Sequence, residues 1–284
     1  MNNVEKELVE TMNDVNRPST YKEEVAQYTK KDAIHALLFF AIIMLVTVLV
    51  DVFPFLPTGF WMNQAFNGVQ IAVLFVLLMR KRQGLRSVGL HLIDWKKALV
   101  AGLLFVVVYL MLNDGLLPGL LGGWQMASST IIFGAVVRIL IQVFYEDVFY
   151  VGYFQTRIYG LIKKDYLTIF VGSMIFAISH WPWYIRMAMA SPDGLGAEFL
   201  GTLAFLTITW IVAHILFNTV FRHLRSIIPV VLLHFGGHLS LGRLWEDDYG
   251  NGVNETLSIG IIFGFVLLMV WCILPYLKKR KAAV

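Results

Sequence analysis

Acidic and imidazole side chains interrupt the apolar second half of the chain, and these residue types can transfer protons. Glu146 and Asp147 are adjacent, and His180, His234 and His238 follow on later apolar segments. Because His234 and His238 are four residues apart, a helix would present both on one face. A carboxylate near two or three imidazoles can move protons to and from a water molecule. The pattern therefore indicates a site that activates water.

Two more polar residues share the segment that carries Glu146. Arg138, Gln142 and Glu146 recur every four residues, so they lie along one face of a helix. We interpret Arg138 as a structural counter-charge rather than a catalyst. Asp147 either orients the site or faces a solvated cavity, and the sequence leaves both roles open.

The composition places these residues in a lipid bilayer. Of the 284 residues, 58% are hydrophobic and 15% are charged, against about 25% charged residues in soluble proteins. The mean hydropathy is +0.69. Ionisable groups at the centre of a bilayer cost about 2.5–3.5 kcal/mol on insertion scales, so each one is a functional candidate. A net charge of +4 gives no indication of nucleic acid binding, and the lone Cys272 excludes an internal disulfide.

The elements that must position these residues are membrane-spanning helices. A helix crosses the bilayer with about 20 apolar residues, and such runs predict eight spans, at 34–54, 62–79, 97–117, 129–156, 166–182, 199–221, 226–242 and 256–276. The fold class is therefore an all-α polytopic helix bundle. The candidate catalytic residues lie on its fourth, fifth and seventh helices.

Charge placement predicts the orientation of this bundle. Lys and Arg gather between spans two and three, four and five, and six and seven, and again at the end of the chain. The alternate connections, which include 181–194, hold few basic residues. Both termini are therefore predicted to be cytoplasmic, in a multi-pass cell-membrane protein. Residues 1–32 are expected to form a solvated, partly helical tail without a signal peptide, so the first span stays as an uncleaved anchor.

The candidate residues lie at similar depths in this topology. Helices rise about 1.5 Å per residue, which places Glu146, His180 and His234 about 14 to 22 Å from their cytoplasmic boundaries. Side chains from three helices can therefore converge in one layer of the membrane.

Three segments resemble the motifs of a known family. They read YEDVFYVGYFQTRI, FAISH and SIIPVVLLHFGGH. They are similar to the CAAX proteases and bacteriocin-processing enzymes (the CPBP or Abi family, which includes type II CAAX prenyl endopeptidases), a family of intramembrane glutamic proteases. The resemblance covers roughly residues 130–242. It divides the chain into leading helices at 33–128, a protease core at 129–242, and a last helix with a basic cytoplasmic tail at 243–284.

The resemblance implies a role for each matching residue. Glu146 would activate the hydrolytic water with help from His180, which closes the Phe176–His180 motif. His234 would stabilise the tetrahedral oxyanion together with His238. Such a mechanism requires neither a cofactor nor a metal, and the expected partner is a membrane-associated peptide or protein substrate. The compact chain with plain tails suits a bacterial member.

The sequence departs from the family pattern at three positions. The second Glu is Asp147, the family Arg is Val151, and the closing Asn is His238. Without that Arg, Asp147 lacks its usual ion pair, and our hypothesis is that Arg138 or Arg157 substitutes for it.

A His-three-Asn pattern, His214 and Asn218, occurs one span earlier. We prefer His234 for the third motif because the family-like segment 226–229 leads into its helix. His214 is instead predicted to pack within the bundle, hydrogen-bonded with Asn218 or a neighbour.

Other functions remained open. Two histidines at i and i+4 match helical zinc ligands, but the segment lacks the Glu of an HExxH motif. The loss of Arg at Val151 favours a non-catalytic member of the same fold, acting in bacteriocin self-immunity or as a peptide-binding scaffold. A proton-coupled transporter ranks last because no internal repeat supports it.

Overall fold

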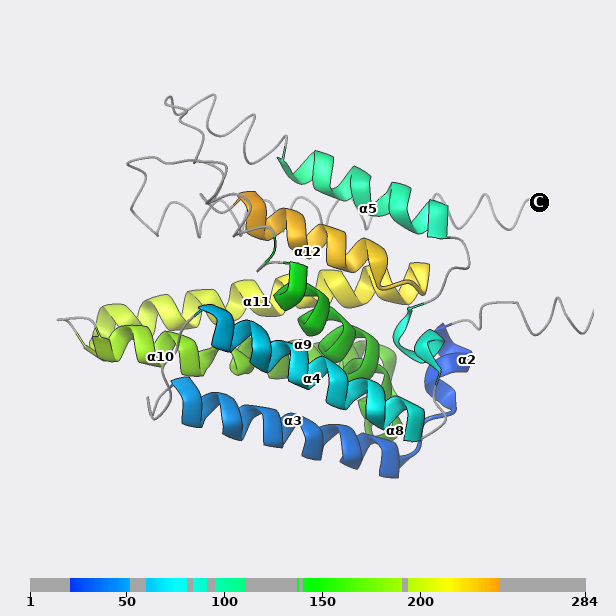
Figure 1. Cartoon of the computed structure of the whole chain (residues 1–284), viewed down its shortest axis with the longest axis horizontal. Coiled ribbons are helices and arrows are strands. Elements are labelled where there is room, and N and C mark those ends of the chain that lie inside the picture. Colours follow the sequence, from blue (N-terminus) through cyan, green and yellow to red (C-terminus); the bar gives the residue numbers. More distant parts are fainter. Residues whose placement is uncertain are drawn as a thin grey trace, which may run out of the picture.

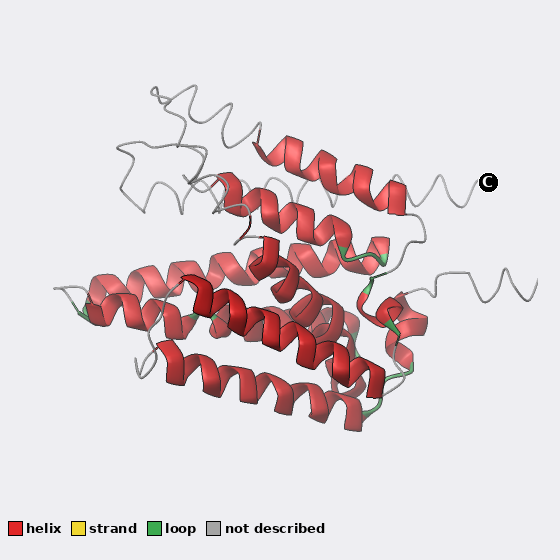
Figure 2. Cartoon of the chain, in the orientation of Figure 1, coloured by secondary structure: helices red, strands yellow, loops and turns green. Residues whose placement is uncertain are grey.

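The computed structural model describes residues 21–51, 60–80, 84–90, 95–110, 137, 140–190 and 194–240. All regular elements in these ranges are helices (Figures 1 and 2), which confirms the all-α class. The α-helices are α2 (Tyr21–Ala26), α3 (Lys30–Asp51), α4 (Phe60–Arg80), α5 (Trp95–Leu110), α8 (Gln155–Ile162), α9 (Asp165–Ser179), α10 (Trp181–Ala190), α11 (Ala197–Leu224) and α12 (Ile228–Ser240). A 3₁₀ helix, η1 (Leu85–Val88), and a π-helix, η3 (Asp147–Phe154), complete the described elements.

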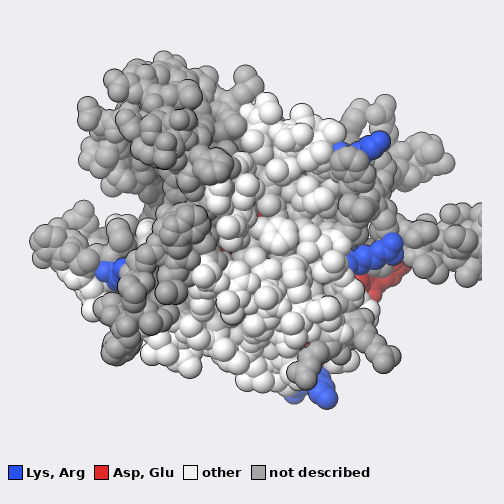
Figure 3. Space-filling model, viewed as in Figure 1, with Lys and Arg blue, Asp and Glu red and all other residues white. Residues whose placement is uncertain are grey.

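Two of the described helices are long and apolar enough to cross a membrane, through Lys30–Leu49 in α3 and Phe199–Leu224 in α11. They coincide with the first and sixth predicted spans. The number of transmembrane helices stays a prediction, and the eighth span, 256–276, lies outside the described residues. Figure 3 shows a largely uncharged face, with Lys and Arg near its edges. A surface of that kind is suited to lipid.

The π-helix η3 forms the centre of the bundle. All eight of its residues are buried, and it contacts α3, α8, α9, α11 and η1. Aromatic rings fill this centre, with Phe149 against Phe39 of α3 and Tyr150 against Phe176 of α9. In Figure 1, α5 and α12 lie together along one edge of the bundle and α3 lies along the other. The core therefore surrounds the segment that begins at Glu146.

Helix α10 occupies residues that we expected to form only a connection. Its composition explains the difference, because Met and Ala favour helices, and Pro182 lies in the first turn, where its missing N–H costs nothing. One side of the helix is buried through Ala188, while Trp183 is exposed. Helix α10 packs against α3, α9 and α11.

Residues 21–32, the described part of the predicted tail, pack against the bundle, while residues 1–20 lie outside the described residues. Tyr21 and Val25 of α2 are buried, and α2 packs against α8. Thr29 then begins α3 with a capping box, because its Oγ1 and backbone N–H contact Asp32 Oδ2 (2.8 and 3.0 Å) while Asp32 N–H points back to Thr29 Oγ1. Residues 21–32 are therefore a packed part of the bundle.

Candidate active site

Glu146 and Asp147 lie at the start of the π-helix. Helical residues 140–146 lead into η3, and Glu146 is the residue that precedes it. The backbone N–H of Gln155 bonds Tyr150 O, five residues earlier, which is the pairing of a π-helix. Single π turns inside α-helices are frequent at functional sites. Asp147 is 1% exposed and Glu146 is 9% exposed, so both carboxylates face the protein interior.

Asp147 contacts a histidine from another helix. The Oδ1 atom of Asp147 lies 3.1 Å from Nδ1 of His234 in α12. A carboxylate accepts hydrogen bonds, so Nδ1 carries the proton in this contact. The pairing fixes the orientation of the imidazole and directs its other nitrogen. The buried position of Asp147 against His234 favours the orienting role over the role in a solvated cavity.

The second nitrogen of His234 points toward Glu146. His234 Nε2 lies 3.8 Å from Glu146 Oε2, which is longer than a direct hydrogen bond. The other carboxylate oxygen, Oε1, accepts a bond of 2.8 Å from Nε2 of Gln142. Gln142 therefore holds Glu146, with Oε2 facing the imidazole. Its place on the same helical face was visible in the sequence, but its role as a donor was not.

Two contacts fix the side chain of His180, which lies at the end of α9: a hydrogen bond at one ring nitrogen and a stacked aromatic ring. Its Nδ1 lies 2.9 Å from the carbonyl oxygen of Phe176, so Nδ1 donates and Nε2 keeps its lone pair in the neutral ring. Trp210 of α11 stacks on the ring with centroids 4.6 Å apart and planes 16° apart. No sequence signal pointed to Trp210.

Two aromatic rings connect His180 with His234. Phe176 lies 4.7 Å from the His180 ring and 6.5 Å from the His234 ring. Trp210, which stacks on His180, also lies 6.5 Å from His234. The structure thus brings Glu146, Asp147, His180 and His234 into one region from three predicted spans. His238 follows one turn further along α12, and its side chain lies outside the described part of the structure.

His214 and Asn218 form a packing contact, as predicted. Nδ2 of Asn218 lies 2.8 Å from Nδ1 of His214 and also bonds the His214 carbonyl. Ser173 Oγ lies 3.2 Å from the same ring nitrogen, and the imidazole stacks on Phe176 at 4.3 Å. Both residues are buried. This pair joins α11 to α9 behind the candidate site.

The residues considered as substitutes for the family Arg have other positions. Val151 is fully buried among apolar residues. Arg157 directs its guanidinium to Ser87 and to the Gly152 carbonyl, whereas Asp147 meets His234. The side chain of Arg138 lies outside the described residues. His234, rather than Arg157, is therefore the partner found against Asp147.

Among the residues that the structure describes, no group of three or more His, Cys, Asp or Glu side chains is arranged to hold a metal ion.

The segment that carries the three motifs matches a known protein family. Residues 127–240 match the family model described as type II CAAX prenyl endopeptidase Rce1-like. No curated protein and no solved structure matches the chain. The matched segment contains all the residues of the candidate site.

Proposed function

We propose that this chain, which through residues 127–240 belongs to the CAAX protease family, cleaves a peptide bond within the membrane with a water molecule activated by Glu146. The family is one of membrane-integral proteases, and the proposal assigns its chemistry to particular atoms of this chain.

The approach of His234 Nε2 to Glu146 Oε2 carries the proposal. These two atoms are 3.8 Å apart, and a polar separation of this length suits a bridging water. Gln142 occupies the other carboxylate oxygen, which leaves Oε2 as the base. Asp147 fixes the orientation of the His234 imidazole through its contact with Nδ1. A water bound here would touch a proton acceptor and an oriented imidazole together.

The proposed reaction follows from these positions. Glu146 removes a proton from the water while the water oxygen forms a bond to the scissile carbonyl carbon. The carbon–nitrogen bond then breaks, and the same proton passes from Glu146 to the leaving amine. His180 assists at the water through Nε2, the nitrogen that its bond to Phe176 leaves available.

The oxyanion needs donors as it forms. His234 can donate from Nε2 when its ring is protonated, and Asp147 supports that form because a carboxylate stabilises an imidazolium. His238 lies one turn away on α12 and is proposed as the second donor. Donors aimed at a developing oxyanion are commonly worth about 3–4 kcal/mol.

The proposed substrate is a membrane-associated peptide or protein. Basic residues lie at two corners of the bundle, which are the connections between helices: Lys163 precedes α9, and Arg222 with Arg225 precedes α12. By the positive-inside rule these corners are cytoplasmic. We accordingly propose a multi-pass protein of a bacterial cell membrane with eight spans and both termini in the cytoplasm.

A non-catalytic role is the second candidate, and Val151 and His238 favour it because both replace residues of the family pattern. In this case the chain would bind a peptide, as in bacteriocin self-immunity, without cleaving it. Variants of Glu146 would then keep the phenotype that deletion of the protein removes.

Protein termini from cells distinguish the two candidates. Cells making the native chain are compared with cells making Glu146→Gln at equal level, by quantitative mass spectrometry of peptide and protein termini. Glu23→Gln, the same change at an exposed carboxylate of α2, serves as the matched control. We expect termini that disappear in Glu146→Gln and persist in Glu23→Gln. Identical termini in all three strains, with each protein folded, would support the binding role instead.

A further inference from the structure

One short loop touches two helices of the candidate site, η3 near its C-terminal end and α12 at its N-terminal end. This loop, residues 84–90, contains η1 and is here called the η1 loop. On one side it packs against η3, which carries Asp147. On the other side the backbone N–H of Ile227, the residue before α12, donates to Gly89 O (3.1 Å). The loop therefore joins the helix of Asp147 to the helix of His234.

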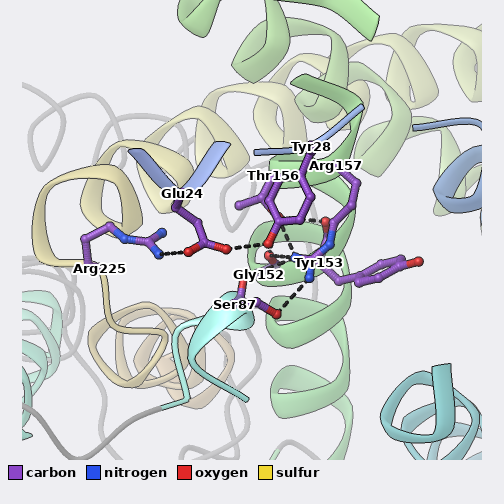
Figure 4. A network of polar contacts seen from close by, with 8 residues as sticks. All are labelled: Glu24, Tyr28, Ser87, Gly152, Tyr153, Thr156, Arg157 and Arg225. Atoms are coloured by element: carbon purple, nitrogen blue, oxygen red, sulfur yellow. Dashed lines mark hydrogen bonds and ion pairs between the residues drawn. The ribbon is translucent and has the colours of Figure 1, made fainter. Parts of the chain in front are cut away.

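Arg157 makes the first of these two connections. Its Nη1 donates to Ser87 O (3.1 Å) and to Gly152 O (3.2 Å), and its Nη2 donates to Ser87 Oγ (2.7 Å), as Figure 4 shows. The side chain is 1% exposed. One planar guanidinium with several fixed donors can hold two backbone carbonyls in a defined geometry.

Thr156 completes the end of the π-helix. Its Oγ1 lies 2.8 Å from the Gly152 carbonyl oxygen and 2.9 Å from the Tyr153 carbonyl oxygen, so its one hydrogen is shared between them, and it accepts a bond from Nη1 of Arg157 at 2.7 Å. Both carbonyls belong to the last turn of η3. Arg157 and Thr156 therefore bind the C-terminal end of the helix whose N-terminal end carries Asp147.

Glycines allow the loop to approach both helices. A Cβ at Gly152 would lie 2.6 Å from the Val88 carbonyl oxygen, so η1 rests directly on the η3 backbone. Gly89 has φ of +78°, which disfavours other residues, and its Cβ would lie 2.9 Å from Ile227 N. Backbone therefore meets backbone on both sides of the loop, leaving little freedom for sliding.

The N-terminal segment closes this unit from outside. The Tyr28 ring lies 4.4 Å from the Arg157 guanidinium carbon. The Tyr28 hydroxyl donates to Glu24 of α2, and Glu24 lies 3.5 Å from Arg225 at the corner before α12. The same two helices are thus connected a second time, through Arg157, Tyr28, Glu24 and Arg225 (Figure 4).

We propose that the η1 loop and Arg157 set the register of η3 against α12 and so bring Asp147 to His234. A π turn holds more residues than an α turn. A loss of the π geometry at the Arg157 end of η3 would therefore rotate Asp147 and Glu146 away from the imidazole. Arg157 and Thr156 are then positioning residues. The kinetic consequence of this inference rests on the proposed function.

Two variants test the unit against one matched control. Thr156→Val and Arg157→Lys remove bonds to the end of η3. Thr168→Val removes a similar bond inside α9, where an equally buried hydroxyl donates to the Lys164 carbonyl at 2.8 Å. We expect Thr156→Val and Arg157→Lys to lower kcat about 10- to 100-fold with KM little changed, because small misplacements of reacting groups have effects of that size. Thr168→Val should keep the native kcat.

A second measurement does not depend on cleavage. The ¹⁵N resonances of His234, assigned by comparison with His234→Gln in histidine-labelled protein, report the Nδ1 contact with Asp147. They should shift in Thr156→Val and Arg157→Lys and stay native in Thr168→Val. Native resonances and native kcat in both variants would overturn the proposal. If Arg157→Lys does not fold, Ser87→Ala, which removes the 2.7 Å bond to Nη2, replaces it with the same expected shift.

The two proposals fail in different ways. A native chain that cleaves nothing, with its His234 signal altered by Thr156→Val, contradicts the proposed function and supports the positioning unit. Cleavage by the native chain, with kcat and the His234 resonances unchanged in the variants, supports the proposed function and contradicts the positioning unit.

Discussion

His234 Nδ1 and Asp147 Oδ1 meet at 3.1 Å, although the two residues lie 87 positions apart in the sequence. The family pattern would give the second carboxylate an Arg partner one turn later, and this chain has Val151 there. The carboxylate instead orients the imidazole that faces Glu146. One lost ion pair is thus accompanied by a buried carboxylate–histidine contact inside the candidate site.

Replacing the orienting carboxylate tests this contact. In Asp147→Asn the ring of His234 loses its charged partner and can adopt the other tautomer, so Nε2 no longer faces Glu146 in the same form. A change of this kind at an orienting Asp lowers kcat by up to about 10⁴-fold in a well-studied protease. We expect a kcat lowered by at least tenfold, with KM nearly native, measured in proteoliposomes. A native kcat in folded Asp147→Asn would show that the contact is only structural.

Gln142 supplies the second prediction. Its amide donates to Glu146 Oε1 at 2.8 Å, and a hydrogen bond to a charged group is worth about 1.5–3 kcal/mol. Gln142→Leu should therefore lower kcat about 10- to 100-fold, since each 1.36 kcal/mol corresponds to a factor of ten. Cleavage rates at saturating substrate measure the effect. Equal rates for the native chain and Gln142→Leu would remove Gln142 from the account.

The pair of His214 and Asn218 should affect stability rather than chemistry. Asn218→Ala removes the closer of the two contacts to Nδ1 of the buried His214, which we expect to lower the free energy of unfolding by about 1–3 kcal/mol. Thermal unfolding in detergent measures this loss. The folded fraction should cleave with native kcat, and a kcat lowered as far as in Asp147→Asn would assign the pair to the reaction instead.

Tyr28 predicts an alkaline limit to stability. Burial, together with the contact to Glu24, raises the pKa of this phenol well above its usual value near 10. Above pH 10 the unfolded chain therefore ionises while the folded chain stays neutral, so stability falls as pH rises. The loss from one such group reaches about 1 kcal/mol near pH 11.

Unfolding temperatures between pH 8 and pH 11 measure this effect. In Tyr28→Phe the decrease above pH 10 should be smaller than in the native chain, while the temperature at pH 8 reports the lost bond to Glu24. Parallel curves for the two proteins would contradict the assignment to Tyr28.

The local parts of this picture could be predicted from the sequence. Long apolar runs define α3 and α11. The positions of Glu146, Phe176 and His180 within short motifs can likewise be recognised without any knowledge of packing. The hydrogen bond between His214 and Asn218 was also accessible, because residues four apart on a helix are neighbours. Such features depend on helical periodicity alone.

Other parts depend on contacts between distant segments. Asp147 meets His234 only because η3 and α12 have one relative register, and no local pattern encodes it. Tyr21 and Glu24 looked like tail residues, yet α8 and Arg225 bury them. The π geometry of η3 likewise arises where packing decides among several allowed local conformations.

The central claim concerns Glu146, and purified protein tests it most directly. Proteoliposomes containing the native chain, Glu146→Gln or Glu23→Gln are incubated with a peptide identified from the cellular termini. The masses of the products are then measured by mass spectrometry. We predict two fragments whose masses sum to the substrate plus one water. The rate should be native in Glu23→Gln and about 10²- to 10⁴-fold lower in Glu146→Gln. Cleavage by Glu146→Gln at the native rate would contradict the account.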